Sequence, residues 1–226
     1  MAMPAPEHSL RIDPAGAPRA TVLFVPPLFE EANRMRRTLV LAMRALAGEG
    51  FTALLPDLPG QNESLTPLEA ADLEIWQSAL ADIAAGIDGP LVVASLRGGA
   101  LIDHRAKAGA WWRLAPANGA ALLRTLLRAR VSADREAGIA SSIESLTEAA
   151  RTEPLLLAGH RLSPAMIAQL GGAEAAPVAP LRSVGVGAEG IAGTPLWLRA
   201  EPGEDAEMAR AIAADIAAWS RTCGII

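Results

Sequence analysis

The sequence predicts an α/β fold with a mostly parallel central sheet. Short apolar runs bounded by Pro, Gly and Asp alternate with longer segments whose apolar residues recur every three or four positions. This alternation is typical of buried strands joined by covering helices, which together form a parallel sheet. The apolar runs predict strands at residues 21–25, 51–55, 90–95, 110–114, 183–187 and 195–200.

The segments between these runs have the period of helices. In residues 31–47, Met35, Leu39 and Met43 fall on one face, and Gly48 ends the pattern as a helix C-cap does. Between residues 118 and 180 the regular alternation of predicted strands and helices stops, so we expect this part to form a helical cap. Further helices are expected at residues 67–87, 98–108, 120–130, 137–150, 164–170 and 204–219.

Length and composition favour one self-sufficient domain. The chain has 226 residues, of which 51% are hydrophobic, and α/β units often reach about 200–250 residues. A chain of this size fills a core without disulfides or metals, and its single cysteine, Cys223, has no companion for either. We therefore expect one domain over residues 1–226 with no metal and no cofactor.

Charge and hydropathy exclude several classes of protein. The 20 Lys+Arg and 25 Asp+Glu residues give a formal net charge of −5 and no basic stripe, which argues against a nucleic-acid partner. No apolar run approaches the roughly 18 residues of a membrane span, and the first residues lack the pattern of a secretory signal. We expect a cytoplasmic protein without a membrane span.

The segment Val92–Ala100 has the frame of a nucleophile elbow, a strand that turns sharply into a helix. In this frame the nucleophile stands two positions from a small residue on either side. With Ala94 and Gly98 as the small residues, the nucleophile position holds Leu96, whose side chain cannot attack a carbonyl. Ser95 is the adjacent candidate nucleophile, and the alternative is that its hydroxyl satisfies a local backbone group. The sequence predicts Leu96 at the tip of the turn.

Several dispersed segments carry a resemblance to a known family. Pro26-Pro27 after the first apolar run, the loop Leu58–Ser64 and the elbow resemble an α/β hydrolase. More narrowly, four segments are similar to the exosortase A system-associated hydrolases of type 2, which bacteria encode near exopolysaccharide and protein-sorting genes. These are Phe24–Asn33 with Arg36-Arg37, Leu96-Arg97, Trp112–Gly119 and Ala158–Ala165. The resemblance implies an α/β-hydrolase-like fold and a hydrolase that acts on an acyl or ester bond.

Ester hydrolysis on this fold also needs a histidine base, an acid that orients it and backbone donors for the oxyanion. Asp205 is the nearest match for the acid, although it could equally cap the terminal helix. No histidine follows His160, which makes His160 in the cap a candidate base in an unusual place. We expect the C-terminal part to be shortened, without the final strand and the loop that would deliver a histidine. Glu201 and Glu204 are further candidate acids, and His104 and His8 are the other histidines.

Open α/β sheets bind ligands at the carboxyl ends of their strands. The backbone N–H groups of Leu28 and Arg97 are candidate oxyanion donors. Glu30 or Glu31 could act as a general base, or could simply favour the N-terminus of a helix. Arg97 could pair with one of these glutamates or hold an anionic substrate. The predicted pocket residues are Leu28, Glu30, Glu31, Leu96, Arg97 and Trp112.

Two functions remain open from the sequence. The first is a hydrolase of the exosortase-associated type that cleaves an acyl or ester bond through an unconventional set of groups. The second is a catalytically degenerate relative, a pseudoenzyme, that binds a small acyl or saccharide ligand or a protein partner without turnover. The sequence also leaves open whether the protein forms a homodimer.

Overall fold

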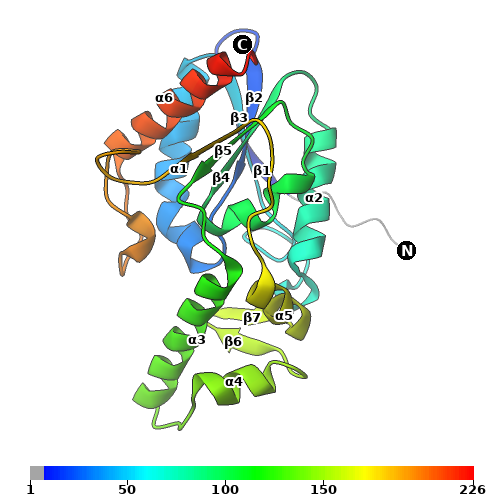
Figure 1. The fold of residues 1–226 in the computed structure, drawn as a ribbon, viewed down its shortest axis with the longest axis vertical. Coiled ribbons are helices and arrows are strands. Elements are labelled where there is room, and N and C mark those ends of the chain that lie inside the picture. Colours follow the sequence, from blue (N-terminus) through cyan, green and yellow to red (C-terminus); the bar gives the residue numbers. More distant parts are fainter. Residues whose placement is uncertain (1–7) are drawn as a thin grey trace.

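The computed structural model describes residues 8–226, which form a six-stranded sheet between two helical layers (Figure 1). The strand order is β1-β3-β2-β4-β5-β8, and β1 pairs antiparallel to β3 while the other neighbours are parallel. The α/β class predicted from the sequence is confirmed. The strands are β1 (Ser9–Ile12), β2 (Ala20–Val25), β3 (Phe51–Pro56), β4 (Leu91–Leu96), β5 (Ala110–Leu114) and β8 (Leu181–Val184).

Helices cover both faces of this sheet. Helices α1 (Glu30–Gly48) and α6 (Ala206–Thr222) pack together on one face, and α2 (Leu73–Ala85) lies on the other (Figure 1). Because successive strand residues point to opposite faces, β2 sends Phe24 toward α1 and α6 and Leu23 toward α2. Within the described part of the chain, no helix is long and apolar enough to cross a membrane.

Residues 119–172, between β5 and β8, lie beyond the carboxyl ends of the strands, and the chain then runs back along the sheet to the start of β8 (Figure 1). Each helix of residues 119–172 begins at a polar residue whose side chain accepts a hydrogen bond from the first helical turn; these residues are Asn118, Ser142 and Ser163. The cap at Ser142 explains why the second helix is shorter than predicted. The elements are α3 (Gly119–Glu136), α4 (Ile143–Ala149), β6 (Leu155–Leu157), β7 (His160–Leu162) and α5 (Pro164–Gly172).

Two predicted elements are of a different type in the structure, and the strand expected at residues 183–187 is β8, which lies at Leu181–Val184. The strand expected at residues 195–200 is the 3₁₀ turn η4 (Leu196–Leu198), which packs on α1. A short buried apolar run cannot be assigned to strand or helical turn from its period alone. The helix expected at residues 98–108 is instead two 3₁₀ turns, η2 (Arg97–Leu101) and η3 (Asp103–Arg105). A third 3₁₀ turn, η1 (Leu68–Ala70), precedes α2.

A buried polar network ties the turns after β4 to the neighbouring strand. Arg113 on β5 donates two hydrogen bonds to Asp103, from Nε to Oδ2 at 2.9 Å and from Nη2 to Oδ1 at 2.6 Å. The Ser95 hydroxyl donates to Asp103 Oδ2 at 2.6 Å, and Arg113 also donates to the Ala176 carbonyl at 2.8 Å. All three side chains are buried. Buried charges are tolerated only when they are paired in this way.

Replacing Arg113 with Met should destabilise the protein strongly, because it leaves the Asp103 carboxylate buried and unpaired. We expect a loss of about 3–5 kcal/mol in the free energy of unfolding, measured by urea denaturation. Arg182→Met is the matched control. Arg182 pairs with Asp215 but its side chain is 42% exposed, so its loss should cost only about 1 kcal/mol or less. Equal losses in the two variants would contradict this role of Asp103 and Arg113.

Candidate active site

The turn after β4 is built around Arg97. Leu96 is still extended, with φ −121° and ψ 134°, and its side chain is fully buried. The next residue, Arg97, has φ 53°. A residue other than glycine in this left-handed region is strained, and a nucleophile elbow holds its nucleophile at such a turn. Arg97 therefore stands at the tip, and the prediction that Leu96 occupies it was wrong by one residue.

Close packing against β2 explains this register. A Cβ atom on Gly99 would lie 2.6 Å from the carbonyl oxygens of both Val25 and Pro26, so only glycine fits there. Gly99 and Ser95 are thus the small residues two positions on either side of Arg97. The sequence could not separate this frame from the one with Ala94 and Gly98, because both have small residues at the required spacing.

Ser95 does not lie at the tip of the turn. Its side chain is 0% exposed, and its hydroxyl is held by Asp103 in the buried network. The structure thus gives Ser95 a local partner, although this partner is a carboxylate rather than the backbone group that the sequence suggested.

The side chain of Arg97 is held on several sides. Its Nε and Nη2 atoms donate to the two carboxylate oxygens of Glu31 at 3.1 and 3.2 Å, and Nη1 donates to the Ala115 carbonyl at 2.9 Å. The guanidinium carbon lies 4.5 Å from the centre of the Trp197 ring system, a cation–π contact. Two-pronged pairing of this kind is the strongest that an arginine makes with a carboxylate. It is one of the two roles that the sequence left open for Arg97.

A second pair, which sequence reasoning missed, lies beside the first. Arg34 Nη2 donates to Glu30 Oε2 at 2.9 Å, and Arg34 Nη1 donates to the Trp197 carbonyl at 2.8 Å. The four-residue spacing on a helix is the signal that could have revealed Glu30 and Arg34. No comparable signal marked Trp197, because its segment has the pattern of a strand. Both arginines thus hold Trp197 in place.

These residues border a cavity of about 280 Å³, which we call the elbow pocket. Phe29 and Ala115 also have positive φ angles, 58° and 43°, so strained residues follow β2, β4 and β5 at the same end of the sheet. Such strain clusters at functional sites.

Four of the six predicted pocket residues line the elbow pocket, whereas Leu96 and Trp112 do not. It is lined by Leu28, Phe29, Glu30, Glu31, Arg34, Arg97, Leu122, Thr125, Leu126, Trp197 and Leu198.

His160 lies near this pocket. Its ring centroid is 5.6 Å from that of Phe29, in an edge-on arrangement. Burial lowers the pKa of His160 below its ordinary value of 6.5, and the nearby Glu30 carboxylate opposes part of that shift. The imidazole of His160 is therefore neutral at pH 7.

Two other predicted site residues lie elsewhere. Asp205 caps α6, because its carboxylate accepts a hydrogen bond from the Met208 N–H at 2.9 Å. The Trp112 indole donates to Asp215 on α6 at 2.6 Å. The prediction that Trp112 approaches the pocket was therefore wrong, since its position on β5 faces α6 rather than the elbow.

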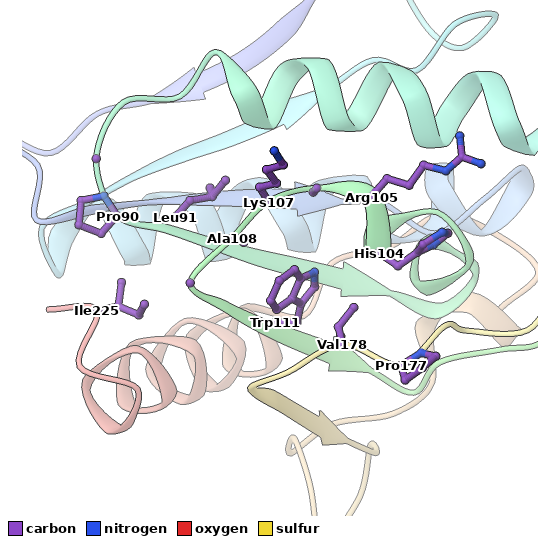
Figure 2. Close-up of a pocket in the computed structure, with 13 residues that line it drawn as sticks. Pro90, Leu91, His104, Arg105, Lys107, Ala108, Trp111, Pro177, Val178 and Ile225 are labelled. Atoms are coloured by element: carbon purple, nitrogen blue, oxygen red, sulfur yellow. The ribbon is translucent and has the colours of Figure 1, made fainter.

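A second cavity of about 670 Å³ opens near the starts of β4 and β5 (Figure 2). Trp111, Pro90 and Val178 line it, and His104 borders it from η3. Burial, with a smaller contribution from Arg105, lowers the pKa of His104. His104 thus contributes to this cavity and not to the lining of the elbow pocket. The cavity contains none of the predicted pocket residues.

Cysteine scanning tests the register of the turn. In a Cys223→Ser background, Arg97→Cys should react with iodoacetamide under native conditions, whereas Leu96→Cys should react only after unfolding. The reason is that Arg97 stands at the tip and Leu96 is 0% exposed. Mass spectrometry of timed samples measures both rates. Faster labelling at position 96 than at position 97 would place the tip at Leu96 after all.

Acidification should destabilise the protein in part through His160. A histidine whose pKa is lowered by folding contributes stability that is present above its unfolded pKa and is lost as the pH falls through the folded pKa. Stability should thus decline as the pH falls below 6.5, the ordinary pKa of histidine, and His160→Gln should lose less over this range than the wild type. Urea unfolding at each pH gives the comparison, and equal slopes for both proteins would contradict the assigned shift.

Comparison with known proteins relates this fold to solved structures. No known protein family and no curated protein matches the chain. Est1E from Butyrivibrio proteoclasticus, solved with bound ferulic acid, is similar with a TM-score of 0.52 and 16% sequence identity, and the match covers 80% of this chain and 74% of that one. Mouse α/β hydrolase domain-containing protein 10 is similar with a TM-score of 0.52 and 14% sequence identity, and the match covers 79% of this chain and 72% of that one. This likeness establishes the fold alone. The chain has the α/β-hydrolase fold.

Proposed function

We propose that this protein binds a small ligand in the elbow pocket without forming a covalent intermediate. The observation that carries the proposal is Arg97 at the place where this fold holds its nucleophile. A guanidinium stays protonated at neutral pH and cannot attack a carbonyl. Its contacts with Glu31 and Trp197 further restrain it. Ser95, the nearest hydroxyl, is buried and hydrogen-bonded to Asp103.

The pocket itself supports a binding role. Left-handed backbone at Phe29 and Arg97 costs about 1–3 kcal/mol each, and here it frames a cavity with apolar walls and a few polar groups. That composition is typical of small-molecule sites. Helix α3 supplies Leu122, Thr125 and Leu126 to the lining, which supports residues 118–180 as a cap over the site. A small acyl or saccharide molecule is the proposed ligand.

Hydrolysis of an acyl or ester bond is the second candidate function. The observation in its favour is His160, which is neutral at pH 7 and lies beside Phe29 and within electrostatic reach of Glu30. A neutral imidazole can act as a general base. In this case it would accept a proton from a water molecule that attacks the ester carbonyl, and would return that proton to the alcohol oxygen as the ester C–O bond breaks. No side chain would form an acyl-enzyme.

Membership of the exosortase-associated group is part of the same proposal, together with a cytoplasmic location. The group membership is supported by contacts between the segments that carry the resemblance. Phe24–Asn33 supplies Phe29 and Glu31, the elbow supplies Arg97, and Ala158–Ala165 supplies His160. Arg97 contacts Glu31, and the His160 ring packs against Phe29.

Activity-based labelling tests the proposal. Neither the wild type nor Ser95→Ala should react with a fluorophosphonate probe, because Arg97 occupies the nucleophile position and Ser95 is buried. Short p-nitrophenyl esters should be hydrolysed no faster than in buffer. Labelling of the wild type that disappears in Ser95→Ala would overturn the proposal. Unlabelled protein that hydrolyses esters, and loses this activity in His160→Gln, would establish the second candidate instead.

A further inference from the structure

The lining of the elbow pocket indicates which kind of molecule it accepts. Resting on the proposed function, we infer that the pocket selects an uncharged, largely apolar molecule of fragment size, and discriminates against carboxylates and ammonium ions of the same shape. Of the two ligand classes proposed above, this favours a small neutral acyl compound over a saccharide. Two features of the lining favour such a molecule, its balanced charges and its apolar surface.

The charged groups of the lining cancel in pairs. Arg97 donates to both oxygens of Glu31, and Arg34 donates to Glu30. Further donors on the two guanidinium groups are used by carbonyl oxygens of the protein, Ala115 for Arg97 and Trp197 for Arg34. Among the residues that line the cavity, two positive charges therefore meet two negative ones, and each has a partner.

A charged ligand would enter such a lining without a free counter-charge. The Arg97 and Glu31 side chains are only 19% and 15% exposed, so a ligand ion bound beside them gives up part of its own hydration. To gain a salt bridge with Arg97, a carboxylate would have to displace Glu31 and leave it partly buried without a partner, and an ammonium ion that paired with Glu31 would do the same to Arg97. The Glu30–Arg34 pair is more exposed, at 42% and 24%, but its charges are also already matched. Breaking a largely desolvated pair is costly, so an uncharged molecule binds better.

Apart from Thr125, the rest of the lining consists of apolar side chains. Leu28, Leu122 and Leu126 line the pocket from the elbow side and from α3, and Leu198 lies at its edge with 75% of its surface exposed. Burial of apolar ligand surface against these side chains provides the binding free energy. A volume of about 280 Å³ is near the lower limit of small-molecule pockets, roughly 300–1,000 Å³. The occupant should therefore be smaller than a typical drug.

Three probes that share one alkyl chain test the inference. Hexanol, hexanoate and hexylammonium are titrated against the whole protein at neutral pH by saturation-transfer difference NMR. We expect hexanol to bind saturably and the two ions to bind about tenfold more weakly or worse. Thr125→Trp should abolish hexanol binding, because Thr125 is exposed and lines the pocket, so an indole there would fill it. Arg124→Trp, at an exposed position of α3 outside the lining, is the control and should bind as the wild type does.

Each other outcome has a definite meaning. If hexanoate or hexylammonium binds as tightly as hexanol, the inferred selectivity is wrong. If hexanol does not bind, or binds equally to Thr125→Trp, the elbow pocket is not a site for uncharged apolar molecules. Circular dichroism melts of both tryptophan variants show whether they are folded. The proposed absence of covalent catalysis is judged separately, since it depends on fluorophosphonate labelling and not on these titrations.

Discussion

The close approach of β2 to the turn after β4 is the constraint on which the site depends. Val25 and Pro26 present their carbonyl oxygens to Gly99, and a side chain there would overlap them. The chain can leave β4 only through a sharp turn, and Arg97 takes the left-handed conformation that this requires. Phe29 is left-handed as well and starts α1 beside the same turn. The first turn of α1 therefore faces the elbow, and Glu31 reaches Arg97.

An arginine at this position performs a structural task that a serine could not. Arg97 joins the first turn of α1, the end of β5 and the loop before α6 through Glu31, Ala115 and Trp197. Arg34 holds the same loop by its backbone. The turn that holds the nucleophile in a nucleophile elbow thus serves here to fix the walls of the elbow pocket, which supports the proposed binding role.

The fold was predictable because parallel strands covered on both faces are continuous apolar runs. β2, β3, β4 and β5 were all predicted in this way. The edge strand β1 was not predicted, since its residues are mostly exposed and its pairing with β3 depends on a distant segment. The turn at residues 196–198 was predicted as a strand because its residues form a short apolar run. Leu196 and Trp197 are apolar because they are buried by packing on α1, and burial alone does not specify backbone conformation.

The site was less predictable, for a reason that the elbow illustrates. The sequence is compatible with two frames, one centred on Leu96 and one on Arg97. In both, small residues stand two positions before and two positions after the central residue. All six residues of β4 are buried, so no alternation of polar and apolar residues marks where the strand ends. Only tertiary contact separates the frames, since Gly99 must fit against β2. A buried strand followed by two glycines should therefore be read in both registers. Here the correct register is the one in which the second glycine, Gly99, packs against β2. It places Arg97, which is already paired with Glu31, at the tip of the turn instead of Leu96.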